Sequence, residues 1–305
     1  MSSNRPFVRS LIKIAVRLAL GGSRAHAQDW FPGLKLNLAT ETQDGAIWYR
    51  GRAVGSLLSA AHSLPSRPSR LLIVGSGPSI EQNDLTRVDG STCILLNGAL
   101  SLVPDVIKEP LAIAIEDERF IWRHFELVQK IPARSLCLFS VSVIRAICEL
   151  DTSWLTDRRI ALIENVRKPY RISRRGTEEL RALPYTRLTD DGASGFSESP
   201  FTAVFQAGSV AVSAMQFAVG WKPSEIGLLG IDLGNADQAR FYETTDKAYS
   251  GIRRAQARII DHLVLAKDVA AESGIEIINH SSISALNDFG FGVSDKLAKP
   301  GEVSR

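Results

Sequence analysis

Short apolar runs alternate along this chain with longer stretches whose polar and apolar positions suit helices. Continuous apolar runs are typical of strands that are covered on both faces, as in parallel sheets. Such runs occur at 71–74, 93–96, 111–115, 136–139, 160–163, 226–230 and 275–278. Helices are expected at 119–130, 141–149, 203–219 and 251–272. The alternation predicts an α/β fold: a single Rossmann-like, doubly wound and mostly parallel sheet.

The pattern changes outside this region. Residues 62–70 are rich in Pro, Ser and Arg and indicate a linker. We therefore expect an N-terminal appendage over 1–69 and one main domain over 70–292. Residues 165–200 lack strong periodicity and are interpreted as a lid-like insertion, and 293–305 as a flexible tail.

Residues 5–20 predict a basic amphipathic helix. Its cations recur every four residues opposite an apolar face: Arg5, Arg9, Lys13 and Arg17 against Phe7, Leu11, Ile14 and Leu18. Such a helix can lie in a membrane interface that carries anionic lipid. It can also simply pack on the domain. A third alternative is an export signal ending at Ala25-His26-Ala27, although two cations interrupt its apolar core. No apolar run is long enough to span a membrane.

Charge and cysteine content narrow the class of protein. The formal net charge is +3, yet residues 1–27 carry five cations and no acid, so the remainder is slightly acidic and is not expected to bind nucleic acid. The three cysteines lie in apolar runs without a metal-ligand spacing. They predict buried, reduced thiols in a cytoplasmic protein.

Polar loops follow the first two strands, and ligands of open α/β sheets bind beyond the carboxyl ends of the strands. The loop after the first strand consists of Gly75, Ser76, Gly77, Pro78 and Ser79. Its amides can hold an anion, or the loop can be a plain tight turn. The second strand is followed by Asn97 and Gly98, which can contact a base, ribose or phosphate, or only form a turn.

Acidic residues follow two further strands. Glu116, Asp117 and Glu118 can supply a base or a metal site, or can merely begin a helix, where acids favour the helix dipole. Asp232 follows the run 226–230 and can contact a ribose or sugar, or pair with Arg240.

Two other features can bind anions. If the helix after residue 203 begins near Gly208 and Ser209, its free amides can meet a phosphate; if it begins near Thr202, its small residues only allow close packing. A basic cluster between 158 and 175 can be a solvated surface or a patch for an anionic saccharide or lipid phosphate.

Taken in order, these motifs resemble bacterial sialyltransferase-like proteins and, closer still, the lipopolysaccharide-core Kdo-III transferases. The likeness covers roughly residues 70–290 and comprises GSGPSI, LLNGA, a strand-end acid, AGSVAVSAMQFAVGW, GLLGIDLGN and RFYE. It implies inverting transfer of a keto-sugar, Kdo by this likeness, from a CMP-activated donor to a lipopolysaccharide-core or related envelope glycan. The CMP-sugar is a donor substrate, so no cofactor and no metal ion is expected.

The resemblance also implies residue roles. CMP would lie against the loop 75–79 and Asn97, and the rest of the pocket would be lined by Gly208, Ser209, Asp232, Arg240 and Tyr242. Those sialyltransferases supply a His base before the last long helix, where this chain has Asp246, Tyr249 and Ser250. Asp117 is therefore the preferred base, and Asp232 the second catalytic candidate.

Two other functions remain open. The first is a metal-dependent pyrophosphokinase-like phosphotransferase with Mg²⁺ on Glu116, Asp117 or Asp232. The second is a non-enzymatic, membrane-associated protein of envelope assembly. For the transferase we expect a CMP-sugar, an anionic glycolipid acceptor and a membrane surface contacted through residues 5–20 as partners. Its expected place is cytoplasmic, peripheral on the inner face of the inner membrane.

Overall fold

The computed structural model describes residues 5–63, 68–234 and 252–300, and the chain forms two compact units. The first unit comprises Met1–Pro65, Ile115–Pro184 and Phe201–Val204. The second comprises Ser66–Ala114, Tyr185–Pro200 and Phe205–Arg305. This division differs from the predicted boundary at 69/70, because the N-terminal segment belongs with residues 115–184. The predicted insertion at 165–200 is also divided, since the chain passes to the second unit after Pro184.

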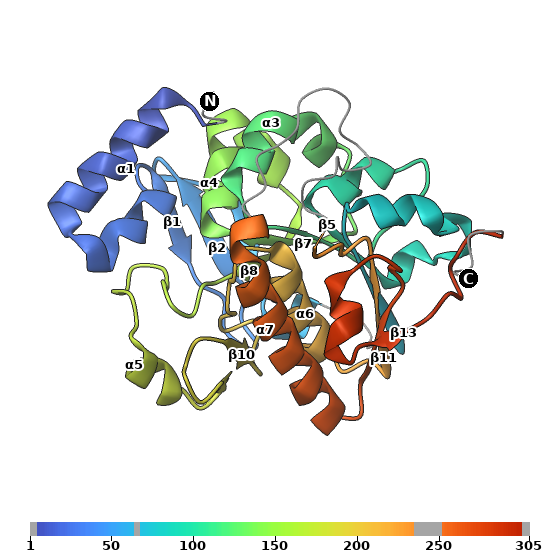
Figure 1. Ribbon diagram of the computed structural model, residues 1–305. Coiled ribbons are helices and arrows are strands. Elements are labelled where there is room, and N and C mark those ends of the chain that lie inside the picture. Colours follow the sequence, from blue (N-terminus) through green and yellow to red (C-terminus); the bar gives the residue numbers. More distant parts are fainter. Residues whose placement is uncertain (1–4, 64–67, 235–251, 301–305) are drawn as a thin grey trace. The chain divides into compact units, whose positions relative to one another are not determined.

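A parallel sheet runs through the second unit, hydrogen-bonded in the order β13-β12-β11-β4-β5-β6 (Figure 1). The strands are β4 (Arg70–Val74), β5 (Cys93–Leu96), β6 (Ala112–Ile115), β11 (Glu225–Leu229), β12 (Glu276–Asn279) and β13 (Gly292–Val293). Nearly every residue of β4, β5, β6 and β11 is buried, which explains the continuous apolar runs in the sequence. The predicted Rossmann-like, mostly parallel α/β fold is confirmed.

The strand order creates a switch point between β4 and β11. The chain enters the sheet at β4 and steps outward to β5 and β6 on one side. It later returns to β11 on the other side of β4 and steps outward to β12 and β13. Loops that leave β4 and β11 therefore turn in opposite directions, and such a point is where open α/β sheets bind ligands.

Helices and short elements complete the second unit. Helix α6 (Val210–Gly220) is buried along almost its whole length and packs against β4 and β5, and α7 (Ile252–Glu272) packs against α6. Short 3₁₀ turns and a β-hairpin fill the connections: η2 (Pro78–Gln82), η3 (Leu85–Arg87), η4 (Gly90–Thr92), η5 (Asn97–Leu102), η7 (Ala285–Phe289), β9 (Thr186–Leu188) and β10 (Gly195–Ser197).

Residues 293–300, part of the expected flexible tail, make backbone contacts within the second unit. Ser294 and Lys299 donate backbone hydrogen bonds to Asn279 and Gln82, at 3.1 and 2.8 Å. Leu297 is buried and accepts a hydrogen bond from the amide of Asp84. The chain is therefore hydrogen-bonded to the second unit as far as Lys299.

The first unit begins with α1 (Phe7–Leu20) and η1 (Gly22–Asp29). An antiparallel meander follows, which the sequence analysis did not predict: β1 (Leu34–Asn37), β2 (Gly45–Tyr49) and β3 (Arg52–Leu57). The remaining elements are α2 (Ala60–Ser63), α3 (Glu118–Gln129), β7 (Leu136–Ser140), α4 (Val141–Leu150), η6 (Thr152–Leu155), β8 (Arg159–Ile163) and α5 (Thr177–Arg181). Strands β7 and β8 are parallel and almost entirely buried.

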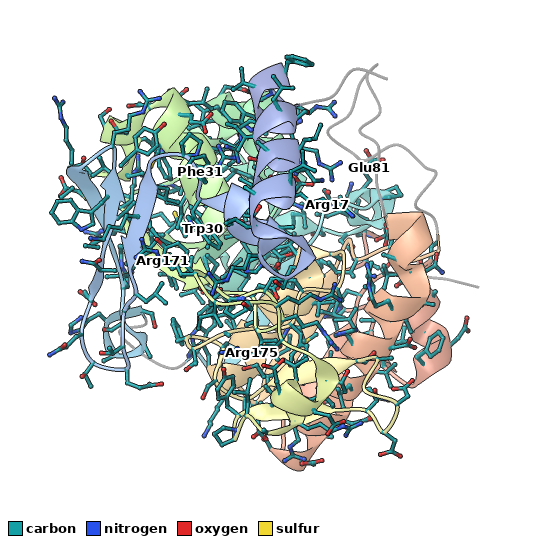
Figure 2. All side chains as sticks on the ribbon, turned by 90° about the vertical axis from the view of Figure 1, so that its left-hand side faces the viewer. Arg17, Trp30, Phe31, Glu81, Arg171 and Arg175 are labelled. Atoms are coloured by element: carbon teal, nitrogen blue, oxygen red, sulfur yellow. The ribbon has the colours of Figure 1, made fainter. Side chains whose placement is uncertain are left out.

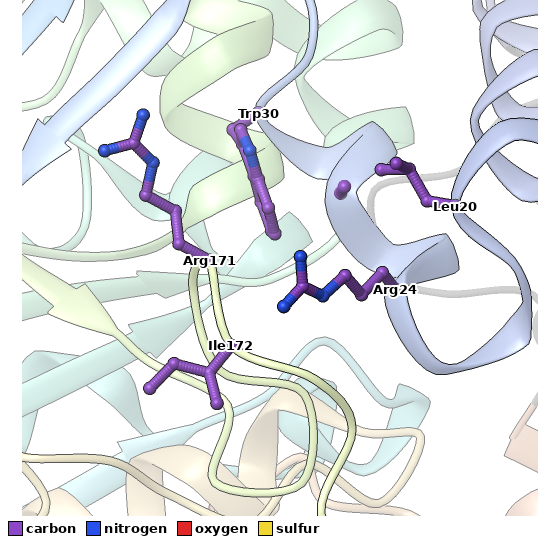
Figure 3. A pocket seen from close by; sticks show the side chains of 6 residues that line it. Leu20, Arg24, Trp30, Arg171 and Ile172 are labelled. Carbon is purple, nitrogen blue, oxygen red and sulfur yellow. The ribbon is translucent and has the colours of Figure 1, made fainter.

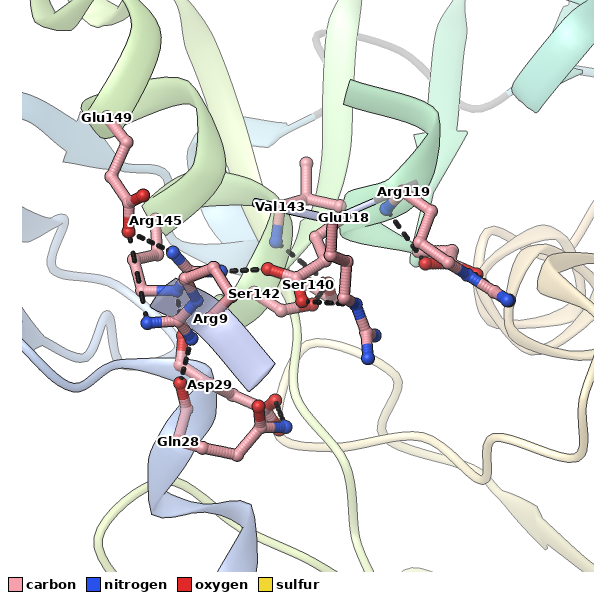
Figure 4. Close-up of polar contacts among 12 residues, drawn as sticks. Arg9, Gln28, Asp29, Glu118, Arg119, Ser140, Ser142, Val143, Arg145 and Glu149 are labelled. Carbon is pink, nitrogen blue, oxygen red and sulfur yellow. Dashed lines mark hydrogen bonds and ion pairs between the residues drawn. The ribbon is translucent and has the colours of Figure 1, made fainter. Parts of the chain in front are cut away.

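The buried side chain of Arg9 attaches α1 to the rest of the first unit, beside a cluster of buried ion pairs around Arg145 (Figure 4). Arg9 is 3% exposed and donates to the backbone carbonyls of Phe31 and Gln28. Arg145 is completely buried and pairs with Glu118 and Glu149, and burial lowers its pKa to about 10. These contacts favour the packing interpretation of the N-terminal helix for one of its faces.

Cys93, Cys137 and Cys148 are buried free thiols, and burial raises the pKa of each to about 12. Within the described residues, no helix combines the length and the apolar character that crossing a membrane requires.

Candidate functional site

The loop after β4 lies directly against the loop after β11. The amide of Gly75 donates to the carbonyl of Leu229 at 2.7 Å, and the amide of Gly77 donates to the carbonyl of Gly230 at 2.9 Å. A Cβ atom at Gly75 would collide with the Gly230 carbonyl. A Cβ at Gly77 would collide with the carboxylate of Asp232. Both glycines are thus required by the approach of two strand ends, before any ligand is considered.

Asp232 fastens three strand ends together. Its carboxylate accepts hydrogen bonds from the Ser79 amide at 2.7 Å, the Ser79 hydroxyl at 2.6 Å and the Ser281 hydroxyl at 2.5 Å. These residues follow β11, β4 and β12. Ser281 was not among the predicted site residues, although its segment Asn279-His280-Ser281 follows a predicted strand. The arrangement gives Asp232 a bracing role at the switch point.

Ser76 is the residue of this loop whose amide remains available. The amides of Gly75, Gly77 and Ser79 are bonded to the chain itself, and Pro78 has none. Among the described residues, the Ser76 amide has no hydrogen-bond acceptor. An anion at the carboxyl end of β4 would therefore meet this N–H group.

Asn97 presents an unpaired oxygen beside the same loop. Strand β5 pairs with β4, Val74 facing Leu95, and Asn97 follows β5 with a left-handed φ of 43°. Its Oδ1 is buried and accepts no hydrogen bond from the described residues. Buried polar atoms in proteins are nearly always paired, so an orphan acceptor at the end of the strand next to the switch point is suited to a ligand donor. Gly98 is buried within η5 and its carbonyl accepts from the Ser101 hydroxyl.

A positive charge lies at the first turn of α6. The helix begins at Val210 with Ser209 as its N-cap. Of the two expected starts, near Thr202 and near Gly208, the structure therefore has the second. Arg258 on α7 donates from Nε to the carbonyl of Ala207 at 2.9 Å. Its Nη2 lies so close to Gly208, whose φ is +100°, that a Cβ there would approach it to 2.9 Å. The helix N-terminus and the guanidinium both favour an anion. Sequence reasoning missed Arg258, which has no motif around it.

The three consecutive acids after β6 do not act as one group. Asp117 caps α3: its carboxylate accepts from the Arg119 amide at 2.9 Å and from Arg119 Nε at 2.7 Å. Glu118 is buried and pairs with Arg145 and Arg5. Asp117 belongs to the first unit, whereas the loop 75–79, Asn97, Gly208 and Asp232 belong to the second. No group of three His, Cys, Asp or Glu side chains suited to a metal ion occurs in the described parts of the chain.

Some predicted residues lie outside the described part of the chain. These are Arg240 and Tyr242 of the expected donor pocket, and Asp246, Tyr249 and Ser250, which stand where the resembling family has its base.

Glu164 and His280 are buried, and burial shifts the pKa of each. Burial raises the pKa of Glu164, directly after β8 in the first unit, to about 7. Its Oε1 accepts from the amides of Asn165 and Tyr170, while Oε2 has no partner among the described residues. Burial lowers the pKa of His280, whose Nδ1 lies 3.1 Å from the Ser294 carbonyl. The imidazole is thus held neutral inside the second unit.

Comparison with known proteins finds similarity among solved structures. No protein-family model matches the chain, and no curated protein matches it significantly. Sialyltransferase CstII from Campylobacter jejuni with CMP-3FNeuAc has a TM-score of 0.39 at 13% identity, covering 76% of this chain and 88% of that one. The MAf glycosyltransferase from Magnetospirillum magneticum AMB-1 has a TM-score of 0.46 at 11% identity, covering 95% of this chain and 38% of that one. Sialyltransferase Cst-I from Campylobacter jejuni has a TM-score of 0.34 at 13% identity, covering 77% and 84%.

Proposed function

We propose that this protein is a glycosyltransferase that takes a keto-sugar, Kdo by the motif resemblance, from a CMP-activated donor. The acceptor would be a lipopolysaccharide-core or related envelope glycan on an anionic glycolipid, and transfer would invert the anomeric centre. The observation that carries the proposal is the buried Oδ1 of Asn97, which has no partner among the described residues and follows the strand next to the switch point. An amide oxygen there can accept from a ribose hydroxyl or from the amino group of cytosine.

The surrounding groups suit the charged part of such a donor. The amide of Ser76, which has no acceptor among the described residues, can donate to the phosphate, and Arg258 with the first turn of α6 favours a phosphate or a sugar carboxylate. As the bond to the anomeric carbon breaks, negative charge builds on the leaving phosphate. Fixed donors aimed at that charge lower the barrier, because they need no reorganisation during the reaction.

Deprotonation of the acceptor hydroxyl needs a base. Asp117 remains the proposed base and Asp232 the second candidate. Both carboxylates already accept hydrogen bonds within the protein, because Asp117 caps α3 and Asp232 holds the loop after β4. Variants that keep these structural contacts are therefore needed to test catalysis.

Calorimetric titration with CMP, ATP and dinucleotides, with and without Mg²⁺, tests the proposal. We expect CMP to bind without metal and Asn97→Gly to weaken it by about tenfold, the worth of one buried hydrogen bond. Glycine tolerates the left-handed φ of this position, so the variant removes the amide without backbone strain. Asn37→Ala, at an exposed asparagine of β1, is the matched control. Binding of ATP only in the presence of Mg²⁺ would overturn the proposal in favour of a phosphotransferase.

A further inference from the structure

The exposed face of α1 is apolar. The large side chains of this stripe are exposed: Leu18 at 81%, Phe7 at 74%, Ile14 at 58% and Leu11 at 49%. The buried residues Arg9 and Val16 lie on the opposite side of the helix, where they contact the first unit. Burial of one face thus leaves a full apolar stripe of the same helix in solvent, which for a protein in water indicates an interaction surface.

Cations border the apolar stripe and acids are absent from it. Lys13 and Arg17 are exposed along one side of the stripe, and no acid occurs between residues 5 and 28. A stripe of this kind, flanked by lysine and arginine, is complementary to an anionic bilayer surface. The apolar side chains enter the acyl boundary, while the long basic side chains reach the head groups.

A cavity opens at the C-terminal end of the same helix (Figure 3). It has a volume of about 220 Å³ and is lined by Leu20, Arg24, Ala27, Trp30, Arg171 and Ile172. Figure 3 shows the indole of Trp30 between Arg24 and Arg171. Figure 2 faces this side, with Arg17 on the helix and Trp30 and Arg171 nearby. Two arginine side chains and four apolar or aromatic residues therefore line the cavity.

The cavity is held in shape by contacts between η1 and the loop after β8. Arg24 donates from Nε to the Ser173 hydroxyl at 3.2 Å, and Arg174 donates its amide to the Ser23 carbonyl at 2.8 Å. His26 Nε2 lies within 3.0 Å of two carbonyls of the same loop. Trp30 packs edge-on against Tyr170 at 4.9 Å between ring centroids.

We propose that α1 binds the surface of an anionic lipid bilayer, and that the adjacent cavity takes the phosphate head group of an anionic lipid. Tryptophan at such a position is suited to the interface, since its ring is apolar and its N–H polar. Arginine binds phosphate through paired N–H donors. This inference does not rest on the proposed transferase activity, because lipid binding needs no sugar donor.

Co-sedimentation of the full chain with phosphatidylcholine vesicles, with and without phosphatidylglycerol, tests the inference. We expect binding only to the anionic vesicles, weakened by salt. The double variant Phe7→Gln/Leu18→Gln should lose about tenfold or more in partitioning, because two large apolar contacts are removed. Val293→Gln, at an apolar residue 63% exposed in the second unit, is the control and should bind normally.

A second variant isolates the cavity. Arg171→Gln should lower binding to phosphatidylglycerol vesicles by roughly fivefold, the contribution of one arginine near an anionic surface. Arg52→Gln, at an exposed arginine of β3, should change it less. Equal losses of vesicle binding in Arg171→Gln and Arg52→Gln would contradict the proposed head-group site. Wild-type vesicle binding by the double variant would overturn the inference. A second result would also overturn the inference: a wild-type dimer that does not bind vesicles and that dissociates in the Phe7→Gln/Leu18→Gln variant. In that case a second copy of the chain would cover the stripe.

Discussion

Asp232 accepts both the backbone amide and the hydroxyl of Ser79, which joins the end of β11 to the loop after β4. The same carboxylate also accepts from Ser281 after β12. Three strand ends thus share one acceptor group. The shape of the switch point, and with it the position of Ser76 and its free amide, depends on this carboxylate.

Replacing Asp232 by Asn should therefore destabilise the second unit. The side-chain NH₂ group of the asparagine would replace one of the two carboxylate oxygens. At least one of the donors on Ser79 and Ser281 would then lose its acceptor, at a cost of about 1–3 kcal/mol. Urea denaturation measures the loss, and Ser79→Ala should show a smaller one. An Asp232→Asn protein of unchanged stability that has lost only turnover would point to catalysis instead of bracing.

Asp117 is expected to contribute to stability as the cap of α3. Asp117→Ala should lose about 1 kcal/mol, and Asp117→Ser should recover most of it, because serine also caps helices. The proposed role as general base makes a separate demand, a kcat lowered by roughly 10²–10⁴ in both variants. Stability and transfer are measured on the same preparations. Normal turnover in Asp117→Ser would leave Asp117 only its capping role.

Arg258 should control affinity for anions at α6. Arg258→Gln is expected to weaken CMP binding by about tenfold, since a hydrogen bond to a charged group is lost. The weakening should shrink at high salt, where screening reduces the wild-type advantage. Titration at two ionic strengths measures both effects. Equal affinity of variant and wild type would place the phosphate elsewhere.

Glu164 should make the stability of the protein pH-dependent. The folded pKa of about 7 lies above the ordinary value of 4.5, so between these values the folded protein holds a proton that the unfolded chain has released. The contribution of Glu164 to the free energy of unfolding is therefore greatest below pH 4.5. It decreases as the pH rises through 7, by at most about 1.4 kcal/mol per pH unit.

Glu164→Gln should flatten this dependence. The amide oxygen can still accept from Asn165 and Tyr170, so the variant should be more stable than the wild type at pH 8 and similar at pH 4.5. Thermal melts across this range provide the measurement. Parallel curves for the two proteins would show that Glu164 does not titrate in this interval.

Arg145 is expected to be the most sensitive charged residue of the first unit. Arg145→Met should cost about 3–5 kcal/mol, because Glu118 and Glu149 would lose their buried partner. Arg187→Met is the comparison, since that arginine pairs with Glu198 and Glu272 at the surface and should matter little. Denaturation midpoints of the two variants that coincide would contradict the buried cluster.

The sequence predicted those elements whose signal is local. Strands β4, β5 and β11 are buried on both faces and read as uninterrupted apolar runs, so they were placed within about a residue. The meander β1–β3 was missed because its strands are only partly buried and so lack a continuous apolar run, as in the alternating pattern of Leu34–Asn37. Helix α6 was expected from residue 203 but begins at Val210, since Gly208 is left-handed and Ser209 is the cap.

The candidate site could be predicted only in part. Ser76 and Asn97 stand at the ends of predicted strands, so their place was accessible from the sequence. The partners of Asp232 were not, because Ser79 lies 153 residues and Ser281 49 residues away along the chain. The burial of Arg9 and Arg145 could not be predicted, since arginine is ordinarily exposed and the carbonyls of Gln28 and Phe31 and the carboxylate of Glu118 come from other segments of the chain.

The polar contacts of Arg9 and Arg5 fix the rotation of α1 about its own axis. Arg9 and Arg5 are held from below, so the helix cannot roll its apolar stripe inward when the protein is free in solution. The stripe is therefore folded and oriented before it meets any partner. Binding of α1 to a surface therefore requires no coil-to-helix transition. It avoids the loss of conformational entropy that accompanies the folding of a disordered anchor on binding.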